Sequence, residues 1–156
     1  MIVMGNHVAD VGVQTNACGI LWNLAVNNYN RLLIVSAGGI DAIVRAMENH
    51  VTNADRQKRA CDVPWKLASD PIYQILIVNA GGIERIMSAL ENHIPCAGVQ
   101  MYACRALWNL ALNDQYKKMI GQFGRVEIIH TAMRSHPHDE NVQSAARRIL
   151  ELLQKK

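Results

Sequence analysis

The sequence repeats with a period of 43 residues, and this period constrains the fold more than any other feature. Residues 8–50 and 51–93 are identical at nearly half of their aligned positions. The period is carried by Trp22, Trp65 and Trp108, by Cys18, Cys61 and Cys104, by Gly38, Gly81 and Gly124, and by His7, His50, His93 and His136. Sequences with a fixed period of this length fold as tandem arrays, in which each unit buries its apolar face against its neighbours.

Each unit is predicted to contain three helices. The apolar residues of the first long segment follow the spacing of one helical face, through Val13, Ala17, Ile20, Leu21 and Leu24. A short helix follows and ends at Gly38, because glycine adopts the left-handed conformation that closes a helix. A third helix then runs over residues 40–49, and no segment alternates as a strand does. The sequence therefore predicts an all-α chain.

The composition limits the classes of partner that the chain can have. Half of the 156 residues are apolar but only 5% are aromatic, which predicts a large aliphatic core. No apolar run approaches the roughly 20 residues that span a bilayer, and no secretory signal pattern is visible. The net charge of +3 is too small to indicate nucleic-acid binding by itself. We therefore expect neither a nucleic-acid nor a membrane partner.

Three of the four cysteines occupy the same position of successive units. The Cα atoms of equivalent residues in stacked units lie roughly 10 Å apart, whereas a disulfide needs them within about 7 Å. We interpret these cysteines as small buried residues of a protein in a reducing compartment, the cytoplasm or the nucleus.

Two motifs recur with the period, an Asn-Leu-Ala run at the end of the long helix and an Ala-Gly-Gly-Ile corner. They stand at Asn23–Ala25 and Asn109–Ala111, and at Ala37–Ile40 and Ala80–Ile83, with a weakened corner at Phe123–Val126. A three-helix unit with these motifs resembles the armadillo repeat family. The resemblance covers the whole chain and implies a right-handed α-solenoid of about three and a half repeats, whose long helices line a concave groove.

On this interpretation residues 1–156 form one armadillo-repeat array. Its parts are a partial repeat over 1–27, full repeats over 28–70 and 71–113, and a C-terminal capping repeat over 114–156. The last unit has Arg147 at the cysteine position and Glu151 at the tryptophan position. Such a polar outer face is typical of a terminal repeat.

The first long helix is not preceded by the helices that would cover it in the middle of an array. We expect an exposed apolar end made of Ile2, Val3, Met4 and part of the segment 11–26. An uncovered patch of this kind tends to find a partner. The chain would then be a fragment of a longer array, an engineered repeat protein, or a module that associates with itself through this end.

The resemblance implies a role for the asparagines of the long helices. In peptide-binding armadillo proteins an asparagine at the position of Asn23 and Asn109 bonds the backbone of an extended peptide, since an amide offers both a donor and an acceptor. Lys66 interrupts this ladder in the second unit. Importin-type proteins also carry a tryptophan four residues earlier, which this sequence lacks, so a nuclear-localisation cargo is not expected. The alternative is that the asparagines face solvent or cap helix ends.

The tryptophans and the basic residues of the long helices are the other candidates. Trp22, Trp65 and Trp108 would form a ladder beside the groove, because tryptophan is favoured at binding hot spots; packing between repeats is the favoured alternative. Arg105, Arg148 and Lys66 would favour an acidic partner. A solvated face held by ion pairs is the favoured alternative for these basic residues, because Asp62 has the helical spacing to pair with Arg59 and with Lys66.

The sequence offers no catalytic constellation, and we predict a non-enzymatic protein without a cofactor or a metal. The repeated histidines lie too far apart to share an ion, whose bonds to histidine are about 2 Å long, and a histidine at a helix C-terminus interacts favourably with the helix dipole. We predict an interaction scaffold that binds an extended peptide in the groove. The alternative is a structural, self-assembling module that makes its contacts through the N-terminal end.

Overall fold

The computed structural model describes residues 2–49, 52–122 and 126–155, and every regular element in these ranges is an α-helix. The helices are α1 (Ile2–Asn6), α2 (Val11–Leu24), α3 (Asn28–Ser36), α4 (Gly39–Asn49), α5 (Ala54–Leu67), α6 (Pro71–Asn79), α7 (Gly82–Asn92), α8 (Ala97–Leu110), α9 (Asp114–Gln122), α10 (Val126–Ser135) and α11 (Glu140–Gln154). None of them is long and apolar enough to cross a membrane.

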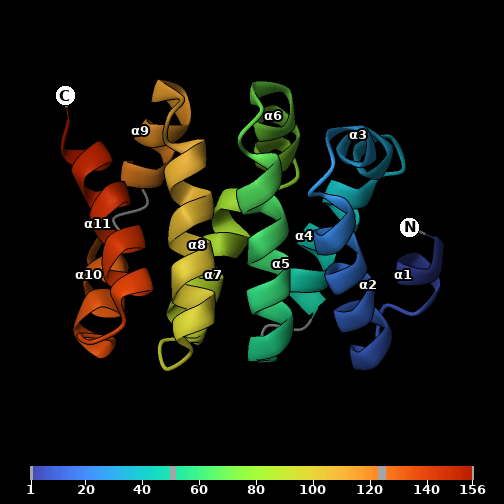
Figure 1. Cartoon of the computed structure of the whole chain (residues 1–156), viewed down its shortest axis with the longest axis horizontal. Helices are drawn as coiled ribbons and strands as arrows, with labels where there is room; N and C mark the ends of the chain where they lie inside the picture. Colours follow the sequence, from blue (N-terminus) through green and yellow to red (C-terminus); the bar gives the residue numbers. More distant parts are fainter. Residues whose placement is uncertain (1, 50–51, 123–125, 156) are drawn as a thin grey trace.

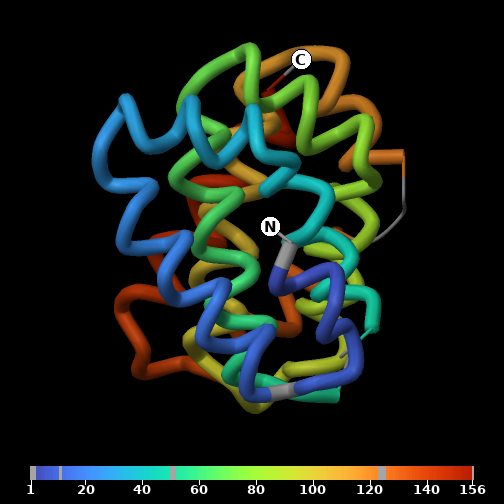
Figure 2. Tube along the Cα trace, turned by 90° about the vertical axis from the view of Figure 1, so that its right-hand side faces the viewer, coloured from blue at the N-terminus to red at the C-terminus, as the bar shows by residue number. Residues whose placement is uncertain are grey.

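The helices stack as a solenoid, which confirms the predicted fold class. Figure 1 shows the four long helices α2, α5, α8 and α11 side by side in chain order, with α4, α7 and α10 behind them and α3, α6 and α9 toward one end. Figure 2 looks along the stack, so that successive units lie one behind the other. We call the surface formed by α2, α5, α8 and α11 the long-helix face.

Side-chain caps fix the start of three of the long helices. Asp10 accepts a hydrogen bond from the backbone of Val13 at 2.9 Å, and Asn53 accepts one from Arg56 at 2.9 Å. Asp139 does the same for α11. These caps satisfy backbone N–H groups that have no partner inside the helix.

Both glycines of the Ala-Gly-Gly-Ile corner are needed for the turn between the two shorter helices. Gly38 and Gly81 have φ angles of +73° and +79°, which residues with a β-carbon rarely adopt. A β-carbon at Gly82 would lie 2.6 Å from Cγ2 of Ile77 and 2.7 Å from its carbonyl oxygen, so this glycine allows close packing. The third corner, at Gly124, lies outside the described residues.

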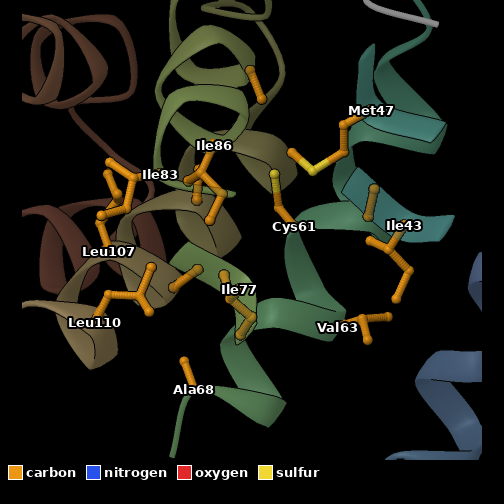
Figure 3. Close-up of a cluster of buried hydrophobic side chains, with 14 of the residues drawn as sticks. Ile43, Met47, Cys61, Val63, Ala68, Ile77, Ile83, Ile86, Leu107 and Leu110 are labelled. Atoms are coloured by element: carbon orange, nitrogen blue, oxygen red, sulfur yellow. The ribbon is translucent and has the colours of Figure 1, made fainter. Parts of the chain in front are cut away.

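The core is aliphatic and runs without interruption through the stack. Figure 3 shows part of it, where Met47, Cys61 and Ile86 from three different helices point toward one another. Cys18, Cys61 and Cys104 are fully buried and form no disulfide. Each unit thus shares its core with the next.

A repeated glutamine joins each long helix to the helix before it. Gln100 Nε2 in α8 donates to the carbonyl of Leu90 at 3.0 Å and to that of His93 at 2.8 Å, at the end of α7. Gln14, Gln57 and Gln143 donate in the same way to Met4 and His7, to Met47, and to Met133 and His136. The last carbonyls of a helix have no partner within it, so these side chains satisfy groups that would otherwise be left unpaired.

The repeated histidines belong to the same helix ends. His93 is the C-cap of α7, and His136 follows α10 and places its Nε2 atom 2.7 Å from the carbonyl of Ile94. His7 follows α1, whereas His50 lies outside the described residues. Their positions agree with a role at helix termini.

We predict that replacing Gln143 by Leu lowers the free energy of unfolding by about 1–3 kcal/mol, because two carbonyl groups at the end of α10 lose their donor. Gln115→Leu is the matched control, since Gln115 is exposed on α9 in the same unit and should change stability by less than about 0.5 kcal/mol. Urea denaturation followed by circular dichroism measures both. Equal effects of the two substitutions would contradict a stabilising role for the glutamine.

Candidate functional site

The residues predicted to form the binding site all lie on helices of the long-helix face. Trp22 and Asn23 lie on α2, Trp65 and Lys66 on α5, Arg105, Trp108 and Asn109 on α8, and Arg148 on α11. Six of them form three pairs across neighbouring helices, each joining a tryptophan to a basic side chain, and the two asparagines belong to none of these pairs.

Each of the three tryptophan rings is covered by a cation from the next long helix. The guanidinium carbon of Arg105 lies 5.1 Å from the ring centroid of Trp65, and that of Arg148 lies 5.0 Å from Trp108. Lys66 Nζ lies 4.3 Å from the centroid of Trp22. Attraction between a cation and the negative face of an aromatic ring holds these side chains in place.

In the pair of Trp22 and Lys66 the cation comes from a different position of the long helix than in the other two pairs. Arg105 and Arg148 stand at equivalent positions, and Asp62 stands at that position in α5. A carboxylate cannot cover a tryptophan ring as a cation does, and Lys66 lies one turn further along α5. The change at Asp62 is therefore accompanied by a shift of the cation to Lys66.

The predicted ion pairs of Asp62 with Arg59 and Lys66 are wrong, because neither forms among the described residues. Lys66 lies over Trp22 instead. The guanidinium of Arg59 occupies space left by Gly19, where a β-carbon would lie 3.0 Å from its Nη1 atom. Both cations lie against α2, which helical spacing within α5 does not show.

The two asparagines of the predicted ladder are in different environments. Asn109 is only 7% exposed, and its Nδ2 donates to the carbonyl of Trp65 at 2.7 Å. This bond ties α8 to α5 and engages the donor of the amide within the chain. Asn23 is exposed on α2. Only Asn23 therefore has both its donor and its acceptor on the surface.

The tryptophans combine the two roles that the sequence left open. All three are half-buried and pack against the core, and their other faces meet the cations of the next helix. Tyr102 adds a further aromatic ring, at 5.8 Å from Trp65 and inclined by 43°. Packing between repeats thus coexists with an aromatic surface on the long-helix face.

Two hollows lie on this face. The first, of about 310 Å³, is called the arginine hollow and is lined by Trp65, Arg105, Trp108, Ser144, Ala145 and Arg148. The second, of about 180 Å³, is called the aspartate hollow and is lined by Trp22, Asp55, Lys58, Arg59, Asp62 and Tyr102. The aspartate hollow was not predicted from the sequence. Asp62, which stands where the next two units have Arg105 and Arg148, is the sequence feature that could have indicated it.

Burial changes the titration of Asp62. The side chain is 5% exposed, and desolvation raises its pKa to about 6, although Lys66, Arg105, Lys58 and a hydrogen bond from Tyr102 oppose the shift. Burial also raises the pKa of Tyr102, with the charge of Asp62 adding to it. The carboxylate of Asp62 is therefore held in a poorly solvated place.

An apolar hollow of about 570 Å³ lies at the N-terminal end of the stack, between α1, α2 and α3, and we call it the N-terminal hollow. Val3, Ile20, Leu24 and Leu33 line it and are exposed, with Ile20 at 59%. Met4 also lines it but is only 4% exposed, so its expected exposure is wrong because it packs into the core. The side chain of Ile2 lies outside the described residues.

The three cysteines at the repeated core position are buried thiols. Burial raises the pKa of the Cys18 thiol to about 11 and that of Cys104 to about 12, and it raises the pKa of Cys61 as well. Thiols with such pKa values are poor nucleophiles. Among the described residues no group of three or more His, Cys, Asp or Glu side chains is placed to hold a metal ion.

The comparisons with known proteins agree on the architecture. The family model described as armadillo/beta-catenin-like repeat matches residues 70–112. An engineered protein, whose crystal structure comes from the Northeast Structural Genomics Consortium, is 26% identical and superposes with a TM-score of 0.60. The match covers 96% of this chain and 46% of that protein, so the chain spans about half of its length. No curated protein matches the chain.

We predict that Asp62→Asn raises the free energy of unfolding by about 1–3 kcal/mol at about pH 7.5, because it removes a buried charge. The pKa of Asp62 in the folded chain, about 6, lies above the ordinary value of about 4, so the folded state binds the proton more tightly. As the pH falls from above 6 toward 4, the folded wild type takes up this proton and the difference in the free energy of unfolding between wild type and Asp62→Asn becomes small. Urea denaturation at pH 7.5 and at pH 4 measures this difference.

Asp55→Asn provides the control, since Asp55 is an exposed carboxylate on the same helix. A constant difference between wild type and Asp62→Asn across this pH range would contradict the assignment of the titration to Asp62.

Proposed function

We propose that the chain, whose residues 70–112 match the armadillo/beta-catenin-like repeat, is a protein-interaction scaffold whose long-helix face holds an extended segment of a partner protein. The repeat architecture supports the scaffold role, and the two hollows beside half-buried aromatic groups and basic groups support this face as the binding surface. Pockets with a few placed polar groups are the usual sites of recognition.

The arginine hollow supports a partner segment that contains an acidic side chain. Arg105 and Arg148 are stacked on tryptophan faces, and neither forms an ion pair with a carboxylate in the described parts of the chain. A stacked guanidinium still presents the N–H groups at its edge, and these match a carboxylate in a two-bond geometry. The hollow between the two arginines therefore suits an aspartate or glutamate side chain.

The position of Asn23 supports contact with the backbone of the same segment. Its amide is exposed on α2, at the other end of the long-helix face from Arg148. An amide can donate to and accept from one peptide group, which requires no particular side chain on the partner. A segment along the face would thus be held by its backbone near α2 and by an acidic side chain near α8 and α11.

We predict that acidic peptides bind and that Arg105→Gln combined with Arg148→Gln weakens them roughly tenfold or more, because charge-assisted hydrogen bonds are lost. Fluorescence anisotropy with a labelled library of equal-length glutamate-rich, lysine-rich and neutral peptides measures the affinities. Arg45→Gln combined with Lys118→Gln is the control, since these cations are exposed on α4 and α9, away from the face. Binding that survives the first double substitution, or a preference for lysine-rich peptides, would refute the acidic-segment proposal.

A second candidate function is self-association through the N-terminal hollow. Val63 and Leu67 in α5 are buried, whereas Ile20 and Leu24 at the equivalent positions of α2 are exposed. None of the described residues that line this hollow is charged. Two copies can therefore meet there in a symmetric contact without repulsion between like charges.

The opposite end of the stack does not suit this hollow. Arg147 and Glu151 are exposed on α11, and packing them against an apolar surface would bury unpaired charges at high cost. A head-to-head dimer is therefore favoured over a head-to-tail chain of copies.

We predict that Ile20→Asp shifts such a dimer to monomer, because the symmetric contact would bury two carboxylates against apolar side chains. Sedimentation velocity over a concentration series measures the association. Leu112→Asp is the matched control, since Leu112 is an equally exposed apolar residue that follows α8. A wild-type chain that stays monomeric at the highest attainable concentration would rule out self-association.

A further inference from the structure

Two of the residues that line the aspartate hollow each carry a buried polar atom that has no hydrogen-bond partner in the described chain. One is the Oδ1 atom of Asp62 in α5, which is an acceptor, and the other is the Nε1 atom of Trp22 in α2, which is a donor. Both residues line the same hollow of about 180 Å³. Buried polar groups are nearly always paired, so two unpaired groups of opposite type in one hollow indicate a ligand that pairs with both.

The neighbouring side chains do not supply these partners. Lys66 lies over the ring of Trp22 and forms no ion pair with Asp62. Tyr102 donates one hydrogen bond to the carboxylate and still leaves Oδ1 unpaired. The guanidinium of Arg59 lies against Gly19. A group from outside the chain is therefore the remaining partner for both atoms.

The charges around the hollow select a neutral ligand. Asp55 and Asp62 are balanced by Lys58 and Arg59 in the lining. An incoming ammonium or guanidinium would add to the cations and would offer no acceptor to Trp22 Nε1. An incoming carboxylate would meet Asp62 and would offer it no donor.

An amide is a neutral group that offers a donor and an acceptor on two separate atoms. This matches two unpaired atoms that belong to different helices, whereas a hydroxyl would have to reach both from a single oxygen. We propose that the aspartate hollow binds an amide group of the partner, with its N–H donating to Asp62 Oδ1 and its carbonyl accepting from Trp22 Nε1. This inference deepens the proposed function by naming the chemistry of one subsite on the long-helix face.

The amide has two sources in a protein partner, and the experiment separates them. The probes are N-acetyl-glutamine methylamide, which carries a side-chain amide, and N-acetyl-norvaline methylamide, which carries peptide groups alone. N-acetyl-glutamate methylamide and N-acetyl-threonine methylamide test a charge and a hydroxyl. The readout is the ¹H–¹⁵N signal of the Trp22 indole in the full chain, assigned by its loss in Trp22→Phe.

We expect the glutamine probe to shift the Trp22 signal in a saturable way, and Asp62→Leu to weaken its binding roughly tenfold or more, since one charge-assisted hydrogen bond is lost. Asp41→Leu, the same substitution at an exposed carboxylate of α4 outside the hollow, should leave the affinity within about twofold. Asp62→Asn keeps the shape of the side chain and should weaken binding by a smaller factor. Thermal unfolding of each variant confirms that it is folded.

The outcomes distinguish the sources and test the inference. Equal binding of the norvaline and glutamine probes assigns the subsite to a peptide group, and binding of the glutamine probe alone assigns it to an Asn or Gln side chain. Tighter binding of the threonine or glutamate probe, or amide binding unchanged in Asp62→Leu, overturns the inference. Acidic peptides that bind without any amide response would refute the subsite alone, and amide binding without peptide binding would refute the proposed function alone.

Discussion

The hydrogen bonds from one glutamine in each long helix to the last carbonyls of the preceding helix hold the units in shape. Gln14, Gln57, Gln100 and Gln143 are the only long polar side chains that the period places at the same internal position of all four long helices. Because each spans a helix boundary, it sets where the long helix lies relative to its neighbour. The parallel row of α2, α5, α8 and α11, and so the whole face that they form, follows from that placement.

On this row the chemistry depends on a few positions that differ between units. The tryptophans are constant, but the partner of each ring comes from the next helix and so changes with its sequence. Arg105 and Arg148 make the hollow between α8 and α11 basic. In the aspartate hollow, Asp62 and one further carboxylate balance the two cations of the lining. One scaffold therefore presents two hollows of different character without any change in its backbone plan.

The sequence was sufficient to predict the fold, because a 43-residue period and helical spacing are properties of the chain alone. The positions of the tryptophans and arginines on one face followed from the same spacing. The surroundings of Arg59 and Lys66 did not, since helical spacing shows neighbours within a helix, whereas Gly19 and Trp22, against which these two cations lie, belong to α2. The role of the glutamines was also missed, because their partners are backbone carbonyls of another helix.

The move of the cation from the position of Asp62 to that of Lys66 has a consequence for any chain that lies along the face. Four residues of helix correspond to about 6 Å along the axis of α5, so its cation stands about one turn away from the level of the arginines on α8 and α11. A surface with a neutral hollow at one end and a basic hollow at the other has a direction. A bound segment turned end to end would place its acidic side chain beside Asp62 and leave Arg105 and Arg148 without a carboxylate. If the proposed acidic segment binds, the face would therefore distinguish the two orientations of one and the same sequence.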